Sequence, residues 1–451
     1  MGGLSRRATV QQSFSKPLVV IEAGNWGWKS SLLPQSKRPQ QRRKAALQLN
    51  AMKNSGIDAI GLGSGDLALG VDFFSEYDGA FVLSNVSCGA QDAWERFRQI
   101  DAGDVSIGFL SVVSTTSTVP KDCSIISPHD AVKELAQKQD IDLWVVSAEM
   151  SQEESRTVST SLGHTLFIDS KSRRMGTTPK KIAENAALLS AGSRGKYVGL
   201  VSIHLPKNSS GLKILGLEES TQKERNRYQE RIDKAKKELN TVSEERDRKR
   251  LERQVQYYSK KIESLPEVEF SNDANPWVIS NVLHGLGKTV SSHKEIEELV
   301  QAYKEKEESL DGKNKTVYKG PFVGSKSCMG CHPYQYKHWG GTAHAKAWRT
   351  LIDEKRSQDQ ACFSCHVTGA HHPEGPQTLG MIQGLESVGC ESCHGPGKEH
   401  VQSSGQADMI KVPSVQNCIQ CHDGIKDEGR FDAASYYPKI RHPSLGTGEE
   451  Q

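Results

Sequence analysis

Four copies of one short motif, C-x-x-C-H, limit what this sequence can fold into. Eight of the ten cysteines lie between Cys328 and Cys421, in four pairs that each enclose two residues and are followed at once by a histidine. A stretch so rich in cysteine and histidine, with few apolar runs, needs metals, disulfides or cofactors to fold. The motifs are Cys328, Cys331 and His332; Cys362, Cys365 and His366; Cys390, Cys393 and His394; and Cys418, Cys421 and His422.

The histidine decides among the chemistries that such cysteine pairs support. Pairs at this spacing also occur in zinc ribbons and as redox dithiols, but neither needs a histidine after the second cysteine every time. In C-x-x-C-H the two thiols add to the vinyl groups of haem, and the adjacent imidazole reaches the iron from one side. The sequence therefore predicts four covalently bound haem c groups. Their proximal iron ligands would be His332, His366, His394 and His422.

Each iron then has a second axial position that is either filled or open. Six further histidines lie in the same segment, whereas only three methionines do, and one of these, Met329, lies inside a motif. This supply of imidazole favours bis-histidine haems, which have lower reduction potentials than haems with Met/His ligation. His338 is interpreted as a surface residue. The candidates for distal ligands are His344, His371, His372, His400 and His442.

Charge and hydropathy exclude several kinds of partner. With 58 Lys and Arg against 55 Asp and Glu, the net charge of +3 is too small to indicate nucleic acid or an anionic membrane as a partner. The longest apolar runs, such as Pro17–Ile21, have the length of a strand, so no transmembrane segment is expected. Cys88 and Cys123 lie outside the motifs, and the sequence leaves open whether they form a disulfide.

The 451 residues divide into segments of different composition. In residues 1–217, apolar stretches such as Val105–Val113 and Tyr197–His204 alternate with helical ones such as Gln41–Lys53, which predicts an α/β domain around a buried sheet. Residues 218–266 are predicted as a charged helical arm, and residues 267–317 as a helix and linker. Residues 318–451 are predicted as a mostly α and irregular tetrahaem domain.

The helical arm contains two apolar series. Of the 46 residues from Glu218 to Glu263, 25 are charged, and the apolar series run from Tyr228 to Val242 and from Leu251 to Leu265 with the 4-3-4-3 spacing of a coiled-coil seam. The nine-residue step between the series breaks the phase. An antiparallel hairpin turning near Ser243–Arg246 explains the break, and so does a continuous helix with a phase shift. The arm is interpreted either as a solvated helical element or as a surface for dimerisation or assembly.

Further residues around the motifs match a known pattern. They are Tyr336, Trp339, Thr342, His344 and Ala345 after the first motif, Thr368-Gly369 after the second, Val388-Gly389 before and Gly395-Pro396-Gly397 after the third, then His400, and a closing Ile440-Arg441-His442. With these, residues 323–442 resemble the cytochrome c-554 type of multihaem cytochrome, which implies electron transfer.

The same resemblance implies a set of distal ligands. It gives His344 to the haem of His394, His371 or His372 to the haem of His332, and His400 to the haem of His422. His442 is left for the haem of His366. One haem can be five-coordinate in that family, and the second, at His366, is the one expected here.

The N-terminal part matches a second pattern at four places. They are Val20–Asn25, Gly63–Asp66, Asp142–Glu149 and Ala191–Gly199. Residues 2–204 thereby resemble the metallophosphoesterase fold of 5′-nucleotidases, in which two metals activate water for attack on phosphorus. Most ligands of that family are missing: Asn25 replaces a bridging aspartate, Ser64-Gly65 replaces an Asn-His pair, and Glu149 ends a strand that should end in histidine. The resemblance therefore implies an α/β sandwich that has lost this catalysis.

Haem is attached to C-x-x-C-H outside the cytoplasm, so we expect a periplasmic or extracellular protein. No apolar stretch of a signal peptide follows the basic N-terminal residues, and the second resemblance places its first strand ahead of Met1, so we expect a mature form or a chain without its true beginning. We predict an exported electron carrier. Its partners would be other multihaem cytochromes or redox donors and acceptors, in a homo-oligomer or filament. The alternative is a haem redox enzyme acting on a small nitrogen or sulfur compound at one five-coordinate haem.

Overall fold

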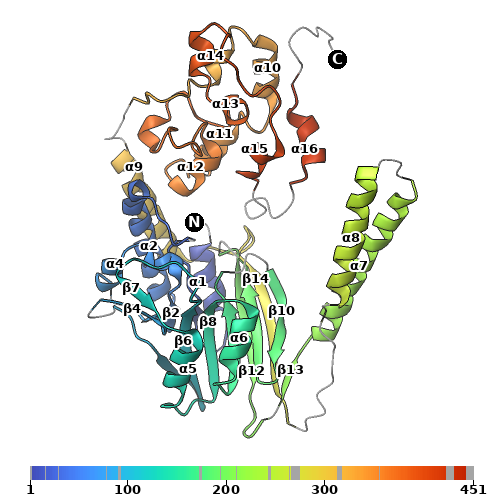
Figure 1. Ribbon diagram of the computed structural model, residues 1–451. Helices are drawn as coiled ribbons and strands as arrows, with labels where there is room; N and C mark the ends of the chain where they lie inside the picture. Colours follow the sequence, from blue (N-terminus) through green and yellow to red (C-terminus); the bar gives the residue numbers. More distant parts are fainter. Residues whose placement is uncertain are drawn as a thin grey trace. The chain divides into compact units, whose positions relative to one another are not determined.

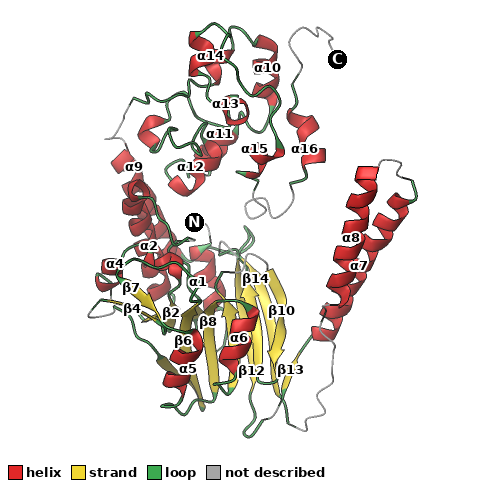
Figure 2. Ribbon diagram, in the orientation of Figure 1, coloured by secondary structure: helices red, strands yellow, loops and turns green. Residues whose placement is uncertain are grey.

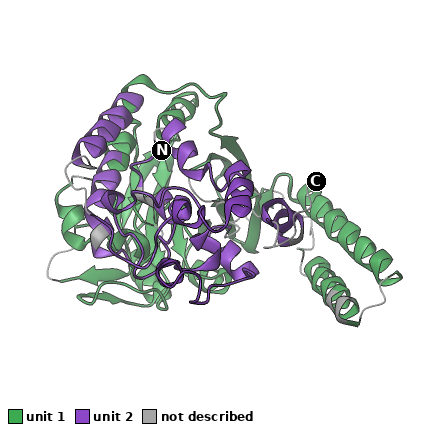
Figure 3. Cartoon of the chain, turned by 90° about the horizontal axis from the view of Figure 1, so that it is seen from above, with its two compact units in different colours: residues 1–32, 48–296 green, residues 33–47, 297–451 purple. Residues whose placement is uncertain are grey.

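Two compact units divide the chain in the computed structural model (Figure 3). One contains residues 1–32 and 48–296, and the other contains residues 33–47 and 297–451. The structure describes residues 3–442 except 16, 29, 78, 90–92, 172–174, 193–194, 210, 242–244, 264, 266–274, 312–316, 355 and 423–430. Among the helices of these residues, none combines the length and the apolar composition needed to cross a bilayer. The four-part division based on composition stays a prediction.

The first unit is an α/β sandwich built on a six-stranded sheet of order β10-β11-β9-β8-β6-β5 (Figures 1 and 2). The four inner strands run parallel, and β10 and β5 pair antiparallel at the edges. Every residue of β8 is buried, as expected for a parallel strand covered on both faces. The strands are β5 (Arg98–Ala102), β6 (Val105–Val113), β8 (Leu143–Glu149), β9 (His164–Asp169), β10 (Met175–Ala183) and β11 (Ala186–Ala191).

Apolar cores lie on both faces of this sheet. Helices α5 (Pro128–Ala136) and α6 (Gln152–Ser159) cover one face through Val132 and Val158. A second sheet of order β12-β14-β13 packs on the other face through Trp277 and Ile279. Its strands are β12 (Tyr197–His204), β13 (Leu212–Ile214) and β14 (Trp277–Gly285). The predicted α/β sandwich is confirmed, although β14 lies in a stretch for which the sequence indicated only helix and linker.

Smaller elements complete the first unit. Cys88 and Cys123 face each other across β4 and β7 and form a disulfide with their Cα atoms 4.0 Å apart, so the structure settles the pairing that the sequence left open. The strands are β1 (Ile21–Glu22), β2 (Ala59–Gly61), β3 (Phe81–Val82), β4 (Val86–Cys88) and β7 (Cys123–Ile125), and the helices are α1 (Leu4–Gln12), α3 (Ser64–Leu67) and α4 (Val71–Ser75). Strands β1, β2 and β3 form a small parallel sheet.

The charged arm is a helical hairpin of α7 (Leu217–Leu239) and α8 (Glu245–Glu263), which lie side by side (Figures 1 and 3). The rings of Tyr228 and Tyr258 stack across it at 5.8 Å, and Ile232 and Leu251 of its seam are buried. The hairpin interpretation is therefore confirmed and the continuous helix is wrong. Of the turn predicted near Ser243–Arg246, residues 243 and 244 lie outside the described part.

The second unit consists of short helices and irregular loops around a small core of Phe322, Phe363, Val367, Ile382 and Leu385. This confirms the mostly α and irregular architecture. Helix α2 (Arg38–Asn54) contributes its first ten residues to this unit. The other elements are η1 (Gln35–Lys37), α9 (Lys294–Asp311), η2 (Ser325–Cys328), α10 (Pro333–Gly341), α11 (Ala347–Asp353), α12 (Gln360–His366), η3 (Leu379–Met381), α13 (Glu391–His394), α14 (Lys398–Gln402), α15 (Val415–Ile419) and α16 (Ala433–Ile440).

Candidate haem-binding sites

Each C-x-x-C-H motif occupies one helical turn. The backbone N–H of the histidine donates to the carbonyl of the first cysteine at 2.9 Å for His332, 3.0 Å for His394 and 2.9 Å for His422, and His366 ends helix α12. Residues i, i+3 and i+4 share one face of such a turn. Each turn therefore directs two thiols and one imidazole to the same side, which is the arrangement that covalent haem attachment needs.

A buried carboxylate inside the third motif joins it to the first. Glu391 is 2% exposed and accepts backbone N–H groups from Val323 at 3.0 Å, from Gly324 at 2.7 Å and from Gly397 at 2.7 Å. A carboxylate with several N–H donors is a strong anchor because each bond is charge-assisted. This role of Glu391 was not predicted from the sequence. The sequence feature that could have indicated it is the charge of this residue, which lies between the two cysteines of the third motif.

Hydroxyl groups tie the second motif to the same framework. The backbone N–H of Cys390 donates to Ser325 Oγ at 3.0 Å, and that of Gly389 donates to Thr368 Oγ1 at 2.9 Å. A side chain at position 389 would not fit, because its Cβ would lie 2.4 Å from Ser325 Oγ and 2.7 Å from Thr368 Oγ1. Several residues around the motifs therefore hold the three attachment turns in register.

Hydrogen bonds at Nδ1 orient three of the candidate imidazoles. The Nδ1 atom of His366 lies 2.6 Å from the carbonyl of Ala347, that of His394 lies 2.5 Å from Ile410, and that of His400 lies 2.7 Å from Ala407. A carbonyl can only accept, so Nδ1 carries the proton in each ring. The lone pair is then on Nε2, which is the usual state of a histidine that binds a metal.

Six of the candidate histidines lie in three pairs. The ring centres of His332 and His400 are 6.3 Å apart, those of His344 and His422 are 6.3 Å apart, and those of His394 and His442 are 5.7 Å apart. Burial and the nearby His422 lower the pKa of His344. At a separation near 6 Å, the facing edges of two imidazoles leave room for two metal–nitrogen bonds of about 2 Å each. The donor set and its spacing therefore fit haem iron.

These pairs differ from the distal ligands that the family resemblance implied, and the choice of ligands stays a prediction. His344 lies against His422 and not His394, His400 lies against His332 and not His422, and His442 lies against His394 and not His366. The three differences have the same cause: which rings lie together depends on how distant loops cross in space, and the order of histidines along the chain does not encode it.

The adjacent His371 and His372 have different surroundings. The Nε2 atom of His371 lies 3.5 Å from Cys421 Sγ, in a cluster that also contains Cys365. The ring of His372 packs on Phe322, and its Nδ1 accepts the backbone N–H of Glu374 at 3.2 Å. In the described part of the chain, the ring facing His332 is that of His400, so neither residue takes the place expected from the resemblance. His338 is exposed, in agreement with its interpretation as a surface residue.

Cysteines of different motifs approach one another. The thiol of Cys328 shares a hydrogen bond with Cys390, which raises the pKa of Cys328 and lowers that of Cys390 to about 6. Burial and the neighbouring Cys418 raise the pKa of Cys393. The sulfurs of Cys365 and Cys421 lie within 4.8 Å of each other. The motifs are therefore neighbours in the order second, fourth, third, first.

Comparison with known proteins bears directly on this region. Residues 327–395 match the family of cytochrome c554 and c-prime. Over 64 residues the chain is 39% identical to cytochrome c-554 of Nitrosomonas europaea, which is 11% of this chain and 27% of that protein. The chain thus spans about a quarter of the length of this relative. The match supports a c-type cytochrome region with covalently bound haem c in this part of the chain.

Comparison with solved structures found likenesses in shape at low sequence identity. The chain is similar to the sulfate thiohydrolase SoxB of Thermus thermophilus with a TM-score of 0.44 and 8% identity, covering 74% of this chain and 54% of that one. It is also similar to a 5′-nucleotidase of Candida albicans with a TM-score of 0.36 and 11% identity, covering 46% of this chain and 42% of that one.

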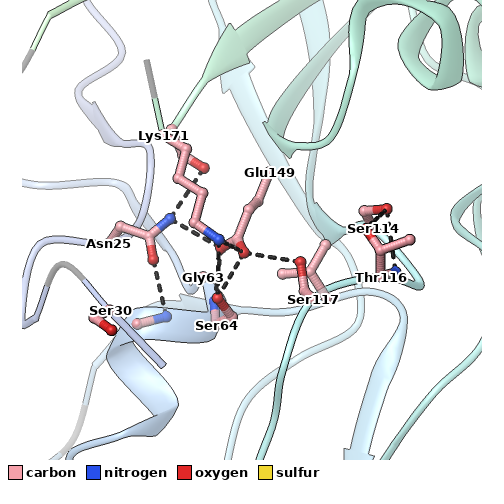
Figure 4. Close-up of polar contacts among 12 residues, drawn as sticks. Asn25, Ser30, Gly63, Ser64, Ser114, Thr116, Ser117, Glu149 and Lys171 are labelled. Atoms are coloured by element: carbon pink, nitrogen blue, oxygen red, sulfur yellow. Dashed lines mark hydrogen bonds and ion pairs between the residues drawn. The ribbon is translucent and has the colours of Figure 1, made fainter. Parts of the chain in front are cut away.

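Apart from the cytochrome c554-like region, a closed polar cluster lies at the end of β8 (Figure 4). Glu149 is 3% exposed and accepts hydrogen bonds from Ser64 Oγ at 2.5 Å and Ser117 Oγ at 2.9 Å, and it forms an ion pair with Lys171. Burial acts to raise the pKa of Glu149, but Lys171, Ser64 and Asn25 outweigh it, so the pKa lies below its ordinary value.

Asn25 closes the other side of this cluster. It adopts a left-handed backbone conformation with φ 54°, its amide donates to Glu149 at 3.0 Å and to Ser170 at 3.3 Å, and its oxygen accepts the N–H of Gly65 at 2.9 Å. Gly63 is needed because its Cβ would lie 2.4 Å from the Asn25 amide. The ammonium of Lys171 pairs with the Glu149 carboxylate, while the second buried carboxylate, Asp66, accepts the backbone N–H groups of Asn25 and Gly63. Among the described residues, the bonded groups of the cluster include no histidine. This donor set does not fit a two-metal centre.

Proposed function

We propose that the chain is an exported tetrahaem c-type cytochrome that relays electrons, with two histidine ligands on three of its haems. The observation that carries the proposal is the set of three imidazole pairs, each joining a motif histidine to a distal candidate: His332 with His400, His422 with His344, and His394 with His442. Iron bound between such pairs supplies one-electron redox chemistry at a low potential.

Exposed apolar side chains at the first and fourth attachment turns support haems bound there. Met329 and Ile419 lie inside the first and fourth motifs, and Ile410, Val412 and Val415 precede the fourth; all five are exposed. Apolar side chains gathered around a polar binding turn are typical of a surface that a ligand covers. A porphyrin held by both cysteines of a motif would cover side chains in these places.

His366 is the reason to keep a second candidate function. Its Nδ1 is bonded to Ala347, yet among the described residues no imidazole faces it as His400 faces His332. The second haem would then have an open axial position. This favours, as the alternative, a redox enzyme that transforms a small nitrogen or sulfur compound at that iron.

The neighbouring thiols support a linear relay through the motifs in the order second, fourth, third, first. The second and first motifs are then the two ends, where electrons enter and leave. Redox partners, such as other multihaem cytochromes or further copies in a filament, would dock at these ends. The Cys88–Cys123 disulfide supports export, because such bonds persist in oxidising compartments.

The decisive experiment measures haem content and the electron paramagnetic resonance spectrum of the oxidised, haem-loaded protein. We expect four haems per chain, three low-spin irons and one high-spin iron that binds cyanide or nitric oxide. Four low-spin irons would remove the enzyme alternative and leave a closed relay. Fewer than four covalently bound haems would contradict the proposal itself.

A further inference from the structure

A helix from the N-terminal half of the chain binds the loop that leads into the second haem motif. Lys44 of α2 contacts both carboxylate oxygens of Asp359, at 3.0 and 3.1 Å, and Gln40 one turn earlier donates to the carbonyl of Gln358 at 2.7 Å. The Lys44 and Asp359 side chains are only 15% and 10% exposed. A lysine and a carboxylate that are both removed from water interact more strongly than a surface pair.

A second ion pair fixes α2 in place. The guanidinium of Arg43 binds both oxygens of Glu307 in α9, at 2.5 and 2.9 Å, and Gln40 donates to the same carboxylate at 3.0 Å. The Glu307 side chain is 4% exposed. Because two hydrogen bonds join the guanidinium to the carboxylate, such a pair fixes the orientation of the two groups as well as the distance between them. Lys44 is therefore held at the loop by its helix as well as by its own bond.

The loop that Lys44 binds is itself hydrogen-bonded to the attachment turn of the second motif. The carbonyl of Asp359 accepts the backbone N–H of Cys362 at 2.8 Å, and Arg356 donates to the carboxylate of Asp359 at 3.2 Å. The charges of Asp359 and of its partners Lys44 and Arg356 are thus held three residues along the chain from the sulfur that tethers the second haem.

We propose that Lys44 is a positioning residue of the second haem site: it balances Asp359 together with Arg356, and its half of that balance keeps the reduction potential of that haem higher than it would be without the ammonium. The inference rests on the proposed function, in which Cys362, Cys365 and His366 hold a haem. Reduction adds one electron to the iron, so an unbalanced carboxylate nearby opposes it and a cation favours it, most strongly where water is excluded.

The test is a redox titration of the full-length, haem-loaded protein, followed by visible absorption and electron paramagnetic resonance. In Lys44→Met we expect one of the four transitions, that of the high-spin iron, to move to lower potential while the other three stay. Asp359→Asn should move the same transition to higher potential. The double variant should return towards the wild type, and Lys44→Arg should restore it. Lys53→Met, at the exposed end of the same helix, is the matched control.

Several outcomes are decisive. Four unchanged potentials in Lys44→Met with all haems present would overturn the inference, as would an equal shift in Lys53→Met. A Lys44→Met protein that carries three haems and leaves Cys362 and Cys365 unmodified would support the inference, provided that Lys44→Arg carries four haems. Unmodified cysteines in another motif would count against it. Failure of the wild type to bind four haems would instead contradict the proposed function, so the two results are distinguishable.

Discussion

At the scale of single residues, protein carbonyls decide which nitrogen of each imidazole is available. Ala347, Ile410 and Ala407 accept the Nδ1 protons of His366, His394 and His400, all in irregular parts of the chain or at helix ends. The fixed tautomer lowers the entropy that ligation would otherwise cost, since the ring is already held by its Nδ1 bond. The backbone that surrounds the motifs therefore takes part in the site beside the motif residues themselves.

Replacing His400 tests one pair directly. In His400→Ala we expect four haems to remain, because all eight motif cysteines are intact, but one low-spin signal should be replaced by a high-spin one. The cause is loss of the imidazole across from His332. The measurement is electron paramagnetic resonance of the oxidised protein. His338→Ala, an exposed histidine in α10, is the control, and an unchanged spectrum in His400→Ala would rule out this ligand.

Replacing Lys171 tests the closed cluster of the first unit. In Lys171→Met we expect the unfolding free energy of this unit to fall by about 1–2 kcal/mol at pH 7, less than for a fully buried pair because the Lys171 side chain is 49% exposed. Lys171 helps to hold the pKa of Glu149 below 4.5, so its contribution is present above that pH and is lost as pH falls through the folded pKa.

Thermal unfolding at pH 7 and at about pH 4, followed by circular dichroism, measures this effect. The difference between Lys171→Met and the wild type should shrink at the lower pH. Lys138→Met, which removes an exposed pair with Glu134, should change little at either pH. A difference that is equal at both pH values would mean that Lys171 acts through packing and not through charge.

At the scale of elements, the strands predicted correctly from the sequence are those whose own residues form a clear apolar pattern. Strands Val105–Val113 and Tyr197–His204 were predicted with the bounds that the structure has, because their apolar runs are long. Strand β14 was missed because it follows the charged arm in a stretch predicted as helix and linker, and buried positions alternate with half-buried ones only over its first four residues. The motif cysteines and the distal candidates could be named from sequence. Which histidines pair could not, because His344 and His422 meet only through the folding of the loops between them.

The hairpin of α7 and α8 should unfold independently of the haem-binding region. Ile232 is 4% exposed within its seam, so Ile232→Ala should cost about 2–5 kcal/mol locally, enough to open a two-helix element. We expect faster tryptic cleavage between residues 217 and 263 and loss of helical circular dichroism, with an unchanged haem spectrum. Tyr257→Ala, at a 52% exposed position of α8, is the control. Equal cleavage in both variants would contradict a seam at Ile232.

At the scale of the whole molecule, the proposed function gives each of the ten cysteines a partner: haem for the eight in the motifs, beside the disulfide that joins Cys88 and Cys123. The denatured, haem-loaded protein should therefore have no thiol that reacts with a maleimide, and two after reduction. Cys88→Ser with Cys123→Ser should lower the stability of the first unit by about 3–4 kcal/mol, since the bond closes a loop between residues 35 apart. A reactive thiol before reduction would show an empty motif or an open disulfide.

Helix α2 has a consequence for how this chain can be divided. Its first turns belong with residues 297–451 and its later turns with residues 48–296, so no single cut yields the two units. A recombinant fragment that starts after residue 296 would leave Glu307 and Asp359 without Arg43 and Lys44. During synthesis, residues 33–47 leave the ribosome long before their partners exist. The C-terminal unit is thus completed by a segment that was made first, and trimming the gene to its cysteine-rich end would remove part of that unit.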